Sequence, residues 1–371
     1  MPVYCNVLWP TRAEALAAPT GDMRLCCCEE CRHVFNAAFR PDSMRDYDQR
    51  YENSLHYSER FRSYAHALAK RWVERYDVRD KDVVEIGCGK GDFLLLLCEA
   101  GHNRGVGYDR SYEEREIDPG LGNRVRFVRD FCPAARPESP ADFICCRQVL
   151  EHVHDPVGLL RGIRAGIGDK ADAVVAFEVP NVMYTLRDLG IWDLIYEHYS
   201  YFTARSLAHA FALAGFRVAS LEEGFDGQYL IVEAFPAEQI GAGDQARTGD
   251  RADFVRYVGA FAERYNEKVG SWSRQLAELK RLGRKTVVWG GGSKGVMFLN
   301  IMRSQGHISY VVDLNPHKQG RFVPVTGQEV VAPEFLKTFR PDNVIVMNPV
   351  YRDEIAGRLR AMDVSAECIP A

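Results

Sequence analysis

The most informative part of the sequence is VVEIGCGKGDF, at residues 83–93. β-Branched residues and an acidic residue are followed by three alternating glycines and then by an apolar run at 93–98. This order predicts a strand, a glycine turn and a helix. Glycine suits such a turn because it accepts unusual backbone angles and lets a ligand approach the main chain. The helix that follows directs its first N–H groups toward the same place.

A glycine turn of this kind also joins strands to helices for packing reasons alone, so the flanking segments have to support a ligand pocket. The next strand, RGVGYD, ends in Asp109, where a doubly wound sheet presents a carboxylate to ribose hydroxyls. The segment VRFVRD ends a third strand in Asp130, and ADFICCRQVLEHV at 141–153 reads as a fourth strand running into a helix. We therefore predict an α/β protein with a Rossmann-like sheet.

These pieces together resemble a class I S-adenosylmethionine-dependent methyltransferase. The matching segments are EIGCGKG at 85–91, the acids at 109 and 130, and VLEHV followed by Asp155 and Pro156. The resemblance implies S-adenosylmethionine as cofactor, with its methionine end at the glycine loop, its ribose at Asp109 and its adenine at Asp130 and Phe131. Glu85 has no basic neighbour, which suits a sulfonium-bearing amino acid better than a dinucleotide. The expected cofactor residues are Glu85, Gly87, Cys88, Gly89, Gly91, Asp109, Asp130, Phe131 and Arg147.

Length and composition predict a soluble globular protein of two to three domains. The chain has 371 residues, of which 46% are hydrophobic and 26% charged, and a formal net charge of −4. This charge offers no electrostatic reason to expect a nucleic-acid or anionic membrane partner. Residues 1–20 lack a basic start followed by an apolar core, and no apolar run approaches the length of a membrane span. We therefore expect a cytoplasmic location.

The first 45 residues form a cysteine-rich segment in which Cys28 and Cys31 have the spacing of half a zinc knuckle. Four soft ligands suit structural Zn²⁺, so we predict a site made of Cys5, Cys26, Cys28 and Cys31. Cys27 and His33 are competing fourth ligands, and a metal-free remnant with free thiols is the alternative. The six later cysteines lie in or near apolar segments and are expected to be buried thiols: Cys88, Cys98, Cys132, Cys145, Cys146 and Cys368.

A methyltransferase domain is expected over 46–235, opening with a polar aromatic segment at 46–57 that is either a surface connector or a flap over the cofactor. Beyond the fifth strand, the run YEHYSYFT at 196–203 gathers titratable groups where open α/β sheets keep their sites. His198 is the best candidate for a general base, because its unperturbed pKa is near neutrality and Glu197 and Tyr201 are close in sequence. His152 is expected to be a packed or cofactor-side residue.

Residues 236–252 read as a linker, and 253–371 as a long amphipathic helix followed by a second, smaller Rossmann-like α/β domain. This domain opens with the strand and loop KTVVWGGGSKG at 285–295, which has the form of a dinucleotide fingerprint. Lys294 is a cation that an NAD loop does not need, and it suits a substrate phosphate. The expected substrate-binding residues are Gly292, Ser293, Lys294, Asn348 and Tyr351.

The order of a cysteine cluster, a methyltransferase core and a small C-terminal α/β unit resembles the bacterial C-methyltransferases that act on nucleotide-linked deoxysugars. The matching residues are Glu197-His198 with Tyr201-Phe202, the loop GGGSKG at 290–295 with Leu299-Asn300, DLNP at 313–316, and NPVY at 348–351. The resemblance implies that His198 removes the proton α to a keto group, that Tyr196 and Glu197 shape the site, and that the C-terminal loop holds a nucleotide diphosphate. The partner would thus be a phosphate-bearing small molecule. An O- or N-methyltransferase, and an NAD- or nucleotide-binding protein without methyl transfer, remain as alternatives.

Overall fold

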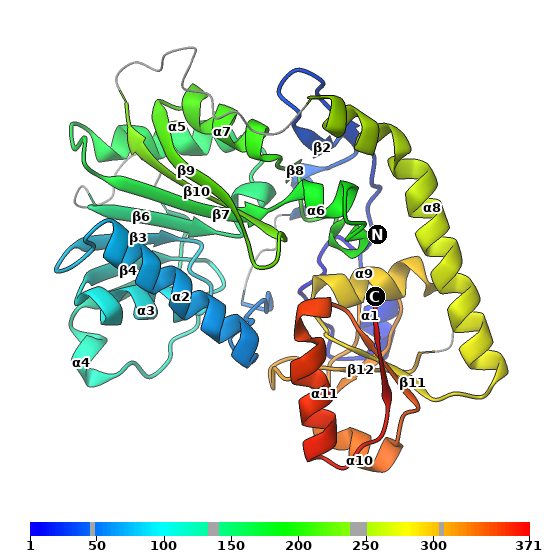
Figure 1. Cartoon of the computed structure of the whole chain (residues 1–371). Helices are drawn as coiled ribbons and strands as arrows, with labels where there is room; N and C mark the ends of the chain where they lie inside the picture. The colour runs from blue at the N-terminus through cyan, green and yellow to red at the C-terminus, as the bar shows by residue number, and fades with distance from the viewer. Residues whose placement is uncertain (45–48, 133–140, 238–250, 304–307) are drawn as a thin grey trace.

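The computed structural model describes residues 1–44, 49–132, 141–237, 251–303 and 308–371. It contains two separate sheets whose strands are mainly parallel, each covered by helices, and a short antiparallel sheet between the N-terminal segment and the methyltransferase part (Figure 1). The predicted α/β class with two Rossmann-like units is confirmed. Within the described residues, no helix is long and apolar enough to cross a membrane.

The larger sheet has seven strands in the order β5-β4-β3-β6-β7-β10-β9. Its first five strands are parallel, and β10 and β9 form an antiparallel hairpin at one edge. In chain order the strands are β3 (Asp82–Ile86), β4 (Arg104–Tyr108), β5 (Val125–Val128), β6 (Phe143–Arg147), β7 (Val174–Pro180), β9 (Phe216–Gly224) and β10 (Tyr229–Pro236).

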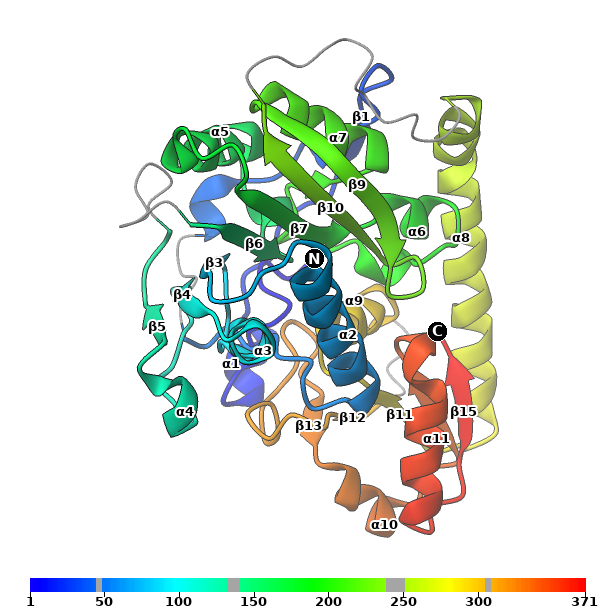
Figure 2. The same ribbon diagram turned by 60° about the vertical axis from the view of Figure 1, so that its left-hand side comes forward.

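Helices cover both faces of this sheet, as Figure 2 shows. One face packs against α2 (Glu59–Arg75) and α3 (Asp92–Gly101), and the other against α5 (Pro156–Ile167) and α7 (Ala204–Leu213). Neighbouring strand residues therefore enter different cores. Cys145 packs with α2 and α3 and Cys146 with α5 and α7, so these two buried thiols point to opposite faces of the sheet. The short helix α4 (Pro119–Gly122) precedes β5.

The smaller sheet is entirely parallel, in the order β13-β12-β11-β14-β15. Its strands are β11 (Thr286–Trp289), β12 (Tyr310–Val312), β13 (Glu329–Val331), β14 (Asn343–Val346) and β15 (Glu367–Pro370). On one face lie α9 (Ser293–Ile301) and part of α8 (Arg251–Arg281), and on the other α10 (Leu336–Phe339) and α11 (Arg352–Ala361). The helix α8 confirms the long amphipathic helix, which buries Trp272 and Leu276 on the small domain. Most of the predicted linker, at 238–250, lies outside the described residues.

The N-terminal segment is not a separate body. It contains α1 (Arg12–Leu16), β1 (Leu25–Cys27), β2 (Val34–Asn36) and η1 (Pro41–Met44), and β2 pairs with β8 (Ser200–Tyr201) of the methyltransferase part. Its first residues run along the small domain, where Trp9 forms a bridge with Phe322. The segment therefore links the two larger units.

The insertion after β7 also joins the two units. It contains α6 (Val182–Leu186) and η3 (Ile191–Asp193), and it leads to β8. Within it, Trp192 packs edge-on against Phe298 of α9, with ring centroids 4.9 Å apart. The carboxyl ends of strands in both sheets are thereby held facing one another.

Candidate active site

An open cavity lies between the carboxyl ends of the parallel strands of the two sheets, with an empty space of roughly 1300 Å³ that includes open solvent. The large sheet contributes residues that end or follow β6 and β7, among them Gln148, Glu151 and Pro180. The small domain contributes residues that end or follow β11, β12 and β14, among them Asp313 and Met347. Open α/β sheets bind their ligands at this edge, and here two such edges share one cavity.

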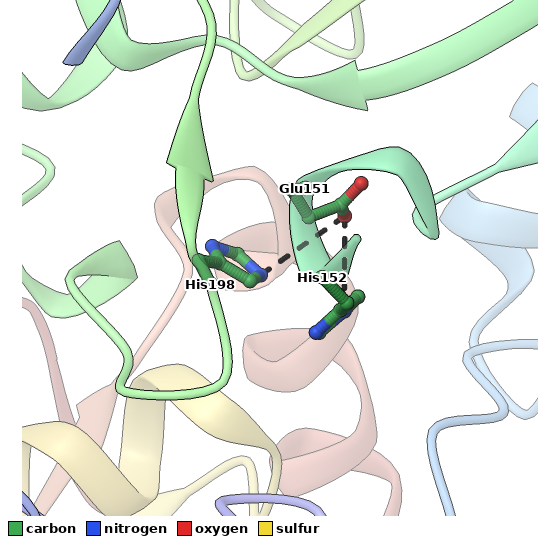
Figure 3. A group of neighbouring side chains, drawn as sticks. All are labelled: Glu151, His152 and His198. Atoms are coloured by element: carbon green, nitrogen blue, oxygen red, sulfur yellow. Dashed lines mark ion pairs between the residues drawn. The ribbon is translucent and has the colours of Figure 1, made fainter. Parts of the chain in front are cut away.

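Three titratable side chains from two segments meet at the wall of this cavity: Glu151, His152 and His198 (Figure 3). Glu151 and His152 lie on η2 (Leu150–His152), directly after β6, and His198 lies on the loop before β8. The Oε1 atom of Glu151 is 4.0 Å from Nε2 of His152 and 4.0 Å from Nε2 of His198. The two histidine rings lie edge to face with centroids 4.8 Å apart.

Backbone contacts bring these two segments together. The amide N of Tyr199 donates to the carbonyl oxygen of Glu151 at 2.9 Å. In the opposite direction, Nδ1 of His152 lies 3.0 Å from the carbonyl oxygen of Glu197. These two contacts fix the positions of residues 151, 152 and 198 relative to one another.

Burial shifts the pKa of each group in this cluster. It raises the pKa of Glu151 to about 8 and lowers that of His152 to about 4. The pKa of His198 falls well below its usual value because of burial and because His152 and Lys294 lie near. At neutral pH both histidines are therefore uncharged. Neither oxygen of Glu151 nor Nδ1 of His198 has a hydrogen-bond partner among the described residues.

The other residues predicted to be catalytic do not line the cavity. Tyr196 accepts a hydrogen bond from the amide of Arg40 at 3.0 Å and stacks on Phe39. Tyr201 donates to the carbonyl oxygen of Ile195 at 2.7 Å, and its ring stands 5.5 Å from that of His198. Both side chains are buried and hold the loop that carries His198.

Glu197 is completely buried and anchors the N-terminal segment. It accepts hydrogen bonds from the amides of Cys5 and Asn6, the latter at 3.3 Å, and from the hydroxyl of Tyr51 at 2.8 Å. Burial raises its pKa. Asn6 and Tyr51 do line the cavity, so Glu197 shapes the site through them. Glu197 is the sequence neighbour of His198, but its side chain points to the N-terminal segment and does not line the cavity.

The glycine loop adopts the geometry that a cofactor needs. Gly87, Gly89 and Gly91 have φ values of 71°, 54° and 86°. A Cβ atom at Gly87 would meet Val149 at 2.2 Å and one at Gly91 would meet Phe127 at 2.4 Å, whereas one at Gly89 would meet nothing within 4 Å. The first and third glycines are thus required by packing, and the middle one leaves open space above the backbone. Cys88 is buried within the loop.

Asp109 follows β4 and is held beside this loop. Its carboxylate accepts from the amide of Gly89 at 2.9 Å and from the amide and hydroxyl of Ser111, each at 2.7 Å. Glu85, the other acid of the loop, is buried, and its Oε2 has no hydrogen-bond partner in the described part of the chain. Burial raises the pKa of Glu85 to about 8. An unsatisfied buried carboxylate, open space at Gly89 and an anchored Asp109 fit a cofactor with an amino group and a ribose.

The remaining expected cofactor residues differ among themselves. Asp130 and Phe131 follow β5 at the surface; Phe131 is 65% exposed, and the guanidinium of Arg110 lies 5.1 Å from its ring centroid. An exposed aromatic ring is available for an adenine. Arg147 is instead committed to the core, where it pairs with Glu178 at 3.0 Å and stacks on Phe93.

All five expected substrate-binding residues line the cavity: Gly292, Ser293, Lys294, Asn348 and Tyr351. Lys294, however, already forms an ion pair with Asp193. Asn348 exchanges two side-chain hydrogen bonds with Gln228, at 3.0 and 2.9 Å. In the polar aromatic segment, Tyr51, Asn53 and Tyr57 face the cavity, while residues 46 to 48 lie outside the described part.

Two residues at the cavity were missed by the sequence analysis. Lys318 is 3% exposed and lines the cavity, with its Nζ atom 3.4 Å from the carbonyl oxygen of Gly291. Among the described residues no carboxylate lies within 4.0 Å of that ammonium group. Glu151 lies in the segment VLEHV, but no role at the cavity was predicted for it. The position of Glu151 just beyond the end of a strand could have indicated a site residue. Lys318 lies in a turn, and no sequence pattern around it indicated a role.

The predicted zinc site is not assembled. Cys5 is buried with Ile191, Trp192 and Val296 beneath the small domain. Cys26, Cys28 and Cys31 lie instead on β1 and the turn before β2, where the Cys28 and Cys31 thiols contact each other. Among the described residues, the one group of three or more possible metal ligands within 4.8 Å of one another is Glu151, His152 and His198. The four predicted ligands do not meet because the first residues of the chain run along the small domain, where Trp9 bridges Phe322, whereas the other three cysteines lie at the hairpin of β1 and β2.

Two family models match the chain in sequence order. A methyltransferase domain matches residues 57–221, and a C-methyltransferase C-terminal domain matches residues 244–367. The first match covers the five parallel strands of the larger sheet, and the second covers the smaller sheet up to the first residue of β15, while β10 lies between the two matches. The glycine loop and Asp109 lie in the first match and the 290–295 loop with Lys318 in the second.

A similar curated protein is the C-methyltransferase NovU from Streptomyces niveus. It is 28% identical over 308 residues, which are 76% of this chain and 70% of NovU. Among solved structures, CalO1, a methyltransferase in calicheamicin biosynthesis with S-adenosylhomocysteine bound, is 22% identical with a TM-score of 0.36. That alignment covers 46% of this chain and only 54% of CalO1. The magnesium protoporphyrin IX methyltransferase of Synechocystis PCC 6803 gives 17% identity and a TM-score of 0.39 over 48% of this chain and 84% of its own.

Proposed function

Because this chain belongs to the class I S-adenosylmethionine-dependent methyltransferases and carries the C-terminal domain of the C-methyltransferases, we propose that it methylates a carbon atom next to a carbonyl group. The acceptor we propose is a phosphate-bearing small molecule of biosynthesis, a nucleotide-linked keto sugar or a related compound. One observation carries this proposal. A single cavity presents a buried proton-accepting cluster on the methyltransferase side and anion-binding groups on the side of the small domain.

S-Adenosylmethionine supplies a sulfonium-bound methyl group that is already electrophilic, so the protein has mainly to align the acceptor and make its carbon nucleophilic. A hydrogen on a carbon beside a carbonyl is weakly acidic, and its removal leaves an enolate. His198 is the residue we assign to this step, because it is neutral, buried and at the wall of the cavity. Glu85, the glycine loop and Asp109 would hold the cofactor.

The anion-binding side is formed by backbone and by lysine. The helix α9 begins without a side-chain cap at Gly292, so the first N–H groups of its nine residues are left for a ligand. Lys294 is neutralised in part by Asp193, whereas the ammonium group of Lys318 is buried at the cavity wall beside Gly291. We assign the phosphate of the acceptor to this loop, with Lys318 as its main cation in place of Lys294.

The direct test uses methyl-labelled S-adenosylmethionine and a nucleoside-diphosphate-linked 4-keto-6-deoxysugar, with the product analysed by NMR. We expect the labelled methyl carbon to be bonded to a ring carbon, and turnover to be lost in His198→Asn. The matched control is the same nucleotide sugar with a hydroxyl group in place of the ketone, which should not be methylated.

Two results would contradict the proposal. A label on oxygen or nitrogen would establish a methyltransferase of another kind, and tight binding of NAD with no binding of S-adenosylhomocysteine would remove methyl transfer altogether. Calorimetry with these two compounds separates the second case from the choice of a wrong acceptor.

A further inference from the structure

Asp313 holds the second glycine loop as Asp109 holds the first. Oδ2 of Asp313 accepts from the amide of Gly291 at 2.7 Å, and Oδ1 accepts from the amide of Asn315 at 2.8 Å. Asp109 likewise accepts from an amide of its own loop at 2.9 Å and from the amide two residues after itself at 2.7 Å. Each acid directly follows the second strand of its unit, β12 or β4. The small domain therefore repeats the arrangement that we assign to the ribose of the cofactor.

The strands around the two acids are also paired alike. β11 pairs in parallel with β12, as β3 does with β4. The amide of Gly290 donates to the last residue of β12, and that of Gly87 to the last residue of β4, each at 2.8 Å. The amides of Asp313 and Asp109 donate in turn to β13 and β5, at 3.1 and 3.0 Å. The two carboxylates therefore occupy corresponding places at the edges of their sheets.

The two loops differ in the groups that would contact the rest of a ligand. The last residue but one of β3 is Glu85, whose buried carboxyl group suits the amino group of a methionine. The corresponding residue of β11 is Val288, which is fully buried and apolar. At this position the second loop offers nothing to an amino acid, so it does not suit a second molecule of the same cofactor.

A positive charge lies at the second loop instead. Lys318 is 3% exposed at the cavity wall, and a Cβ atom on Gly292 would be 3.8 Å from its Nζ atom. Among the described residues, no carboxylate lies within 4.0 Å of that atom. A buried charge without a partner is costly, so this ammonium group calls for an anion from a ligand. Phosphates at Lys318 and at the start of α9 would leave Asp313 for the ribose of the same nucleotide.

We propose that Asp313 accepts a hydrogen bond from a ribose 2′-hydroxyl, so that the acceptor is linked to a ribonucleoside diphosphate and not to its 2′-deoxy counterpart. Each carboxylate oxygen can accept two hydrogen bonds, and the amides of Gly291 and Asn315 take one on each. Asp313 is partly exposed and lines the cavity, so a ligand there can reach it. That this nucleotide carries the methyl acceptor rests on the proposed function.

The experiment is calorimetry of the full chain saturated with S-adenosylhomocysteine, which occupies the first loop. The probes are ADP, GDP, CDP and UDP, each compared with its 2′-deoxy form. We expect the tightest-binding ribonucleotide to bind about 10- to 100-fold more tightly than its 2′-deoxy form, because the latter lacks a hydrogen bond to a charged group. In Asp313→Ala this ratio should fall below about threefold, and in Asp313→Asn, which keeps a neutral acceptor, it should lie in between.

Inorganic pyrophosphate shows whether the loop is intact in these variants. It has no ribose, so replacing Asp313 should not weaken it by more than about threefold. Where Asp313→Ala loses pyrophosphate as well, the loop has been disturbed, and the ratio is read from Asp313→Asn. Glu334→Ala, at an exposed position of the same domain, is the matched control and should change neither quantity.

Four results would overturn the proposal. They are no binding of any nucleoside diphosphate, equal affinity of the unmodified protein for the ribose and 2′-deoxy forms, and an unchanged ratio in Asp313 variants that still bind pyrophosphate. The fourth is tighter binding of NAD than of every nucleoside diphosphate, which would make the small domain a dinucleotide site.

The proposed function is tested separately. If the ratio depends on Asp313 but no methyl group reaches a ring carbon, the proposed function fails while the nucleotide site stands. If the 4-keto sugar is methylated equally well on the ribonucleotide and on its 2′-deoxy form, the ribose inference fails while the proposed function stands. If S-adenosylhomocysteine does not bind, the ratio is measured in Asp109→Ala, which removes the acid of the first loop.

Discussion

Replacing Glu197 by glutamine separates an anchoring role from a catalytic one. In the structure, Oε1 of Glu197 accepts from the amides of Cys5 and Asn6, and Oε2 accepts from the hydroxyl of Tyr51. Glutamine can keep one acceptor for the two amides, but its NH₂ group faces the Tyr51 hydroxyl. That hydroxyl already accepts a hydrogen bond from Nδ2 of Asn6, at 3.2 Å. The substitution therefore loses the charge and one hydrogen bond.

A hydrogen bond to a charged group contributes about 1.5–3 kcal/mol, so we expect Glu197→Gln to weaken the attachment of the N-terminal segment by about 2–3 kcal/mol. Because 1.4 kcal/mol is tenfold in an equilibrium, hydrogen exchange in the peptides containing Cys5 and Tyr51 should become about 30- to 150-fold faster. Hydrogen–deuterium exchange with mass spectrometry measures this locally and needs no two-state unfolding of the whole chain.

Tyr51→Phe provides the control for this prediction. It removes only the hydroxyl and should weaken the same attachment by about 1–2 kcal/mol, and the double variant should fall short of the sum because the two groups share one interaction. The anchoring role would be refuted if Glu197→Gln left exchange unchanged while kcat fell by a factor of about 10³. In that case Glu197 would act on the reaction directly.

Three further predictions concern the cofactor, the phosphate and the pH dependence. Asp109→Ala should weaken S-adenosylhomocysteine by about 100-fold or more in calorimetry, since it removes a charged acceptor of ribose hydroxyls; affinity within threefold of the unmodified protein would disprove that role. Lys318→Met should weaken a nucleoside diphosphate by about 10- to 100-fold and more than Lys294→Met does, because Lys294 is paired with Asp193; the reverse order would return the phosphate to Lys294. Burial raises the pKa of Glu151 to about 8, so the folded protein keeps a proton that the unfolded chain has released. Between pH 6.5 and 8, the free energy of unfolding should therefore fall with rising pH, by about 1–2 kcal/mol from this group. Glu151→Gln should make that slope shallower in thermal unfolding, and an identical slope would mean that the carboxyl is ionised throughout.

Much of the fold was predictable because it rests on local patterns. The strand, glycine turn and helix at 83–98 are written in residue types whose backbone preferences and periodicity need no distant partner. The same holds for the second glycine loop at 290–295 and for the long helix α8. The class of enzyme followed from the order of these pieces, and the family models match it.

The cluster of Glu151, His152 and His198 was only half predictable. His198 was predicted from its residue type and position, but the carboxyl group that faces it belongs to Glu151, 47 positions away in the sequence, and not to its neighbour Glu197. In an irregular loop the direction of each side chain is set by tertiary packing, and here Glu197 is drawn to the amides of the N-terminal strand. The four predicted zinc ligands do not come together for the same reason, since spacing along the chain does not say that Cys5 and Cys28 lie in different parts of the molecule.

The sequence by itself predicted the two Rossmann-like sheets, the glycine loop at 87–91 and His198 as a candidate residue, because each depends on residues within a few positions of one another. Only the tertiary structure decided that the carboxyl ends of the two sheets face one cavity, that Lys318 and not Lys294 is the lysine there without an ion pair among the described residues, and that Glu151 is buried against His198. The physical reason is that burial and pairing of charges depend on which segments pack together. Residues 6, 151, 198 and 318 come from four separate parts of the chain.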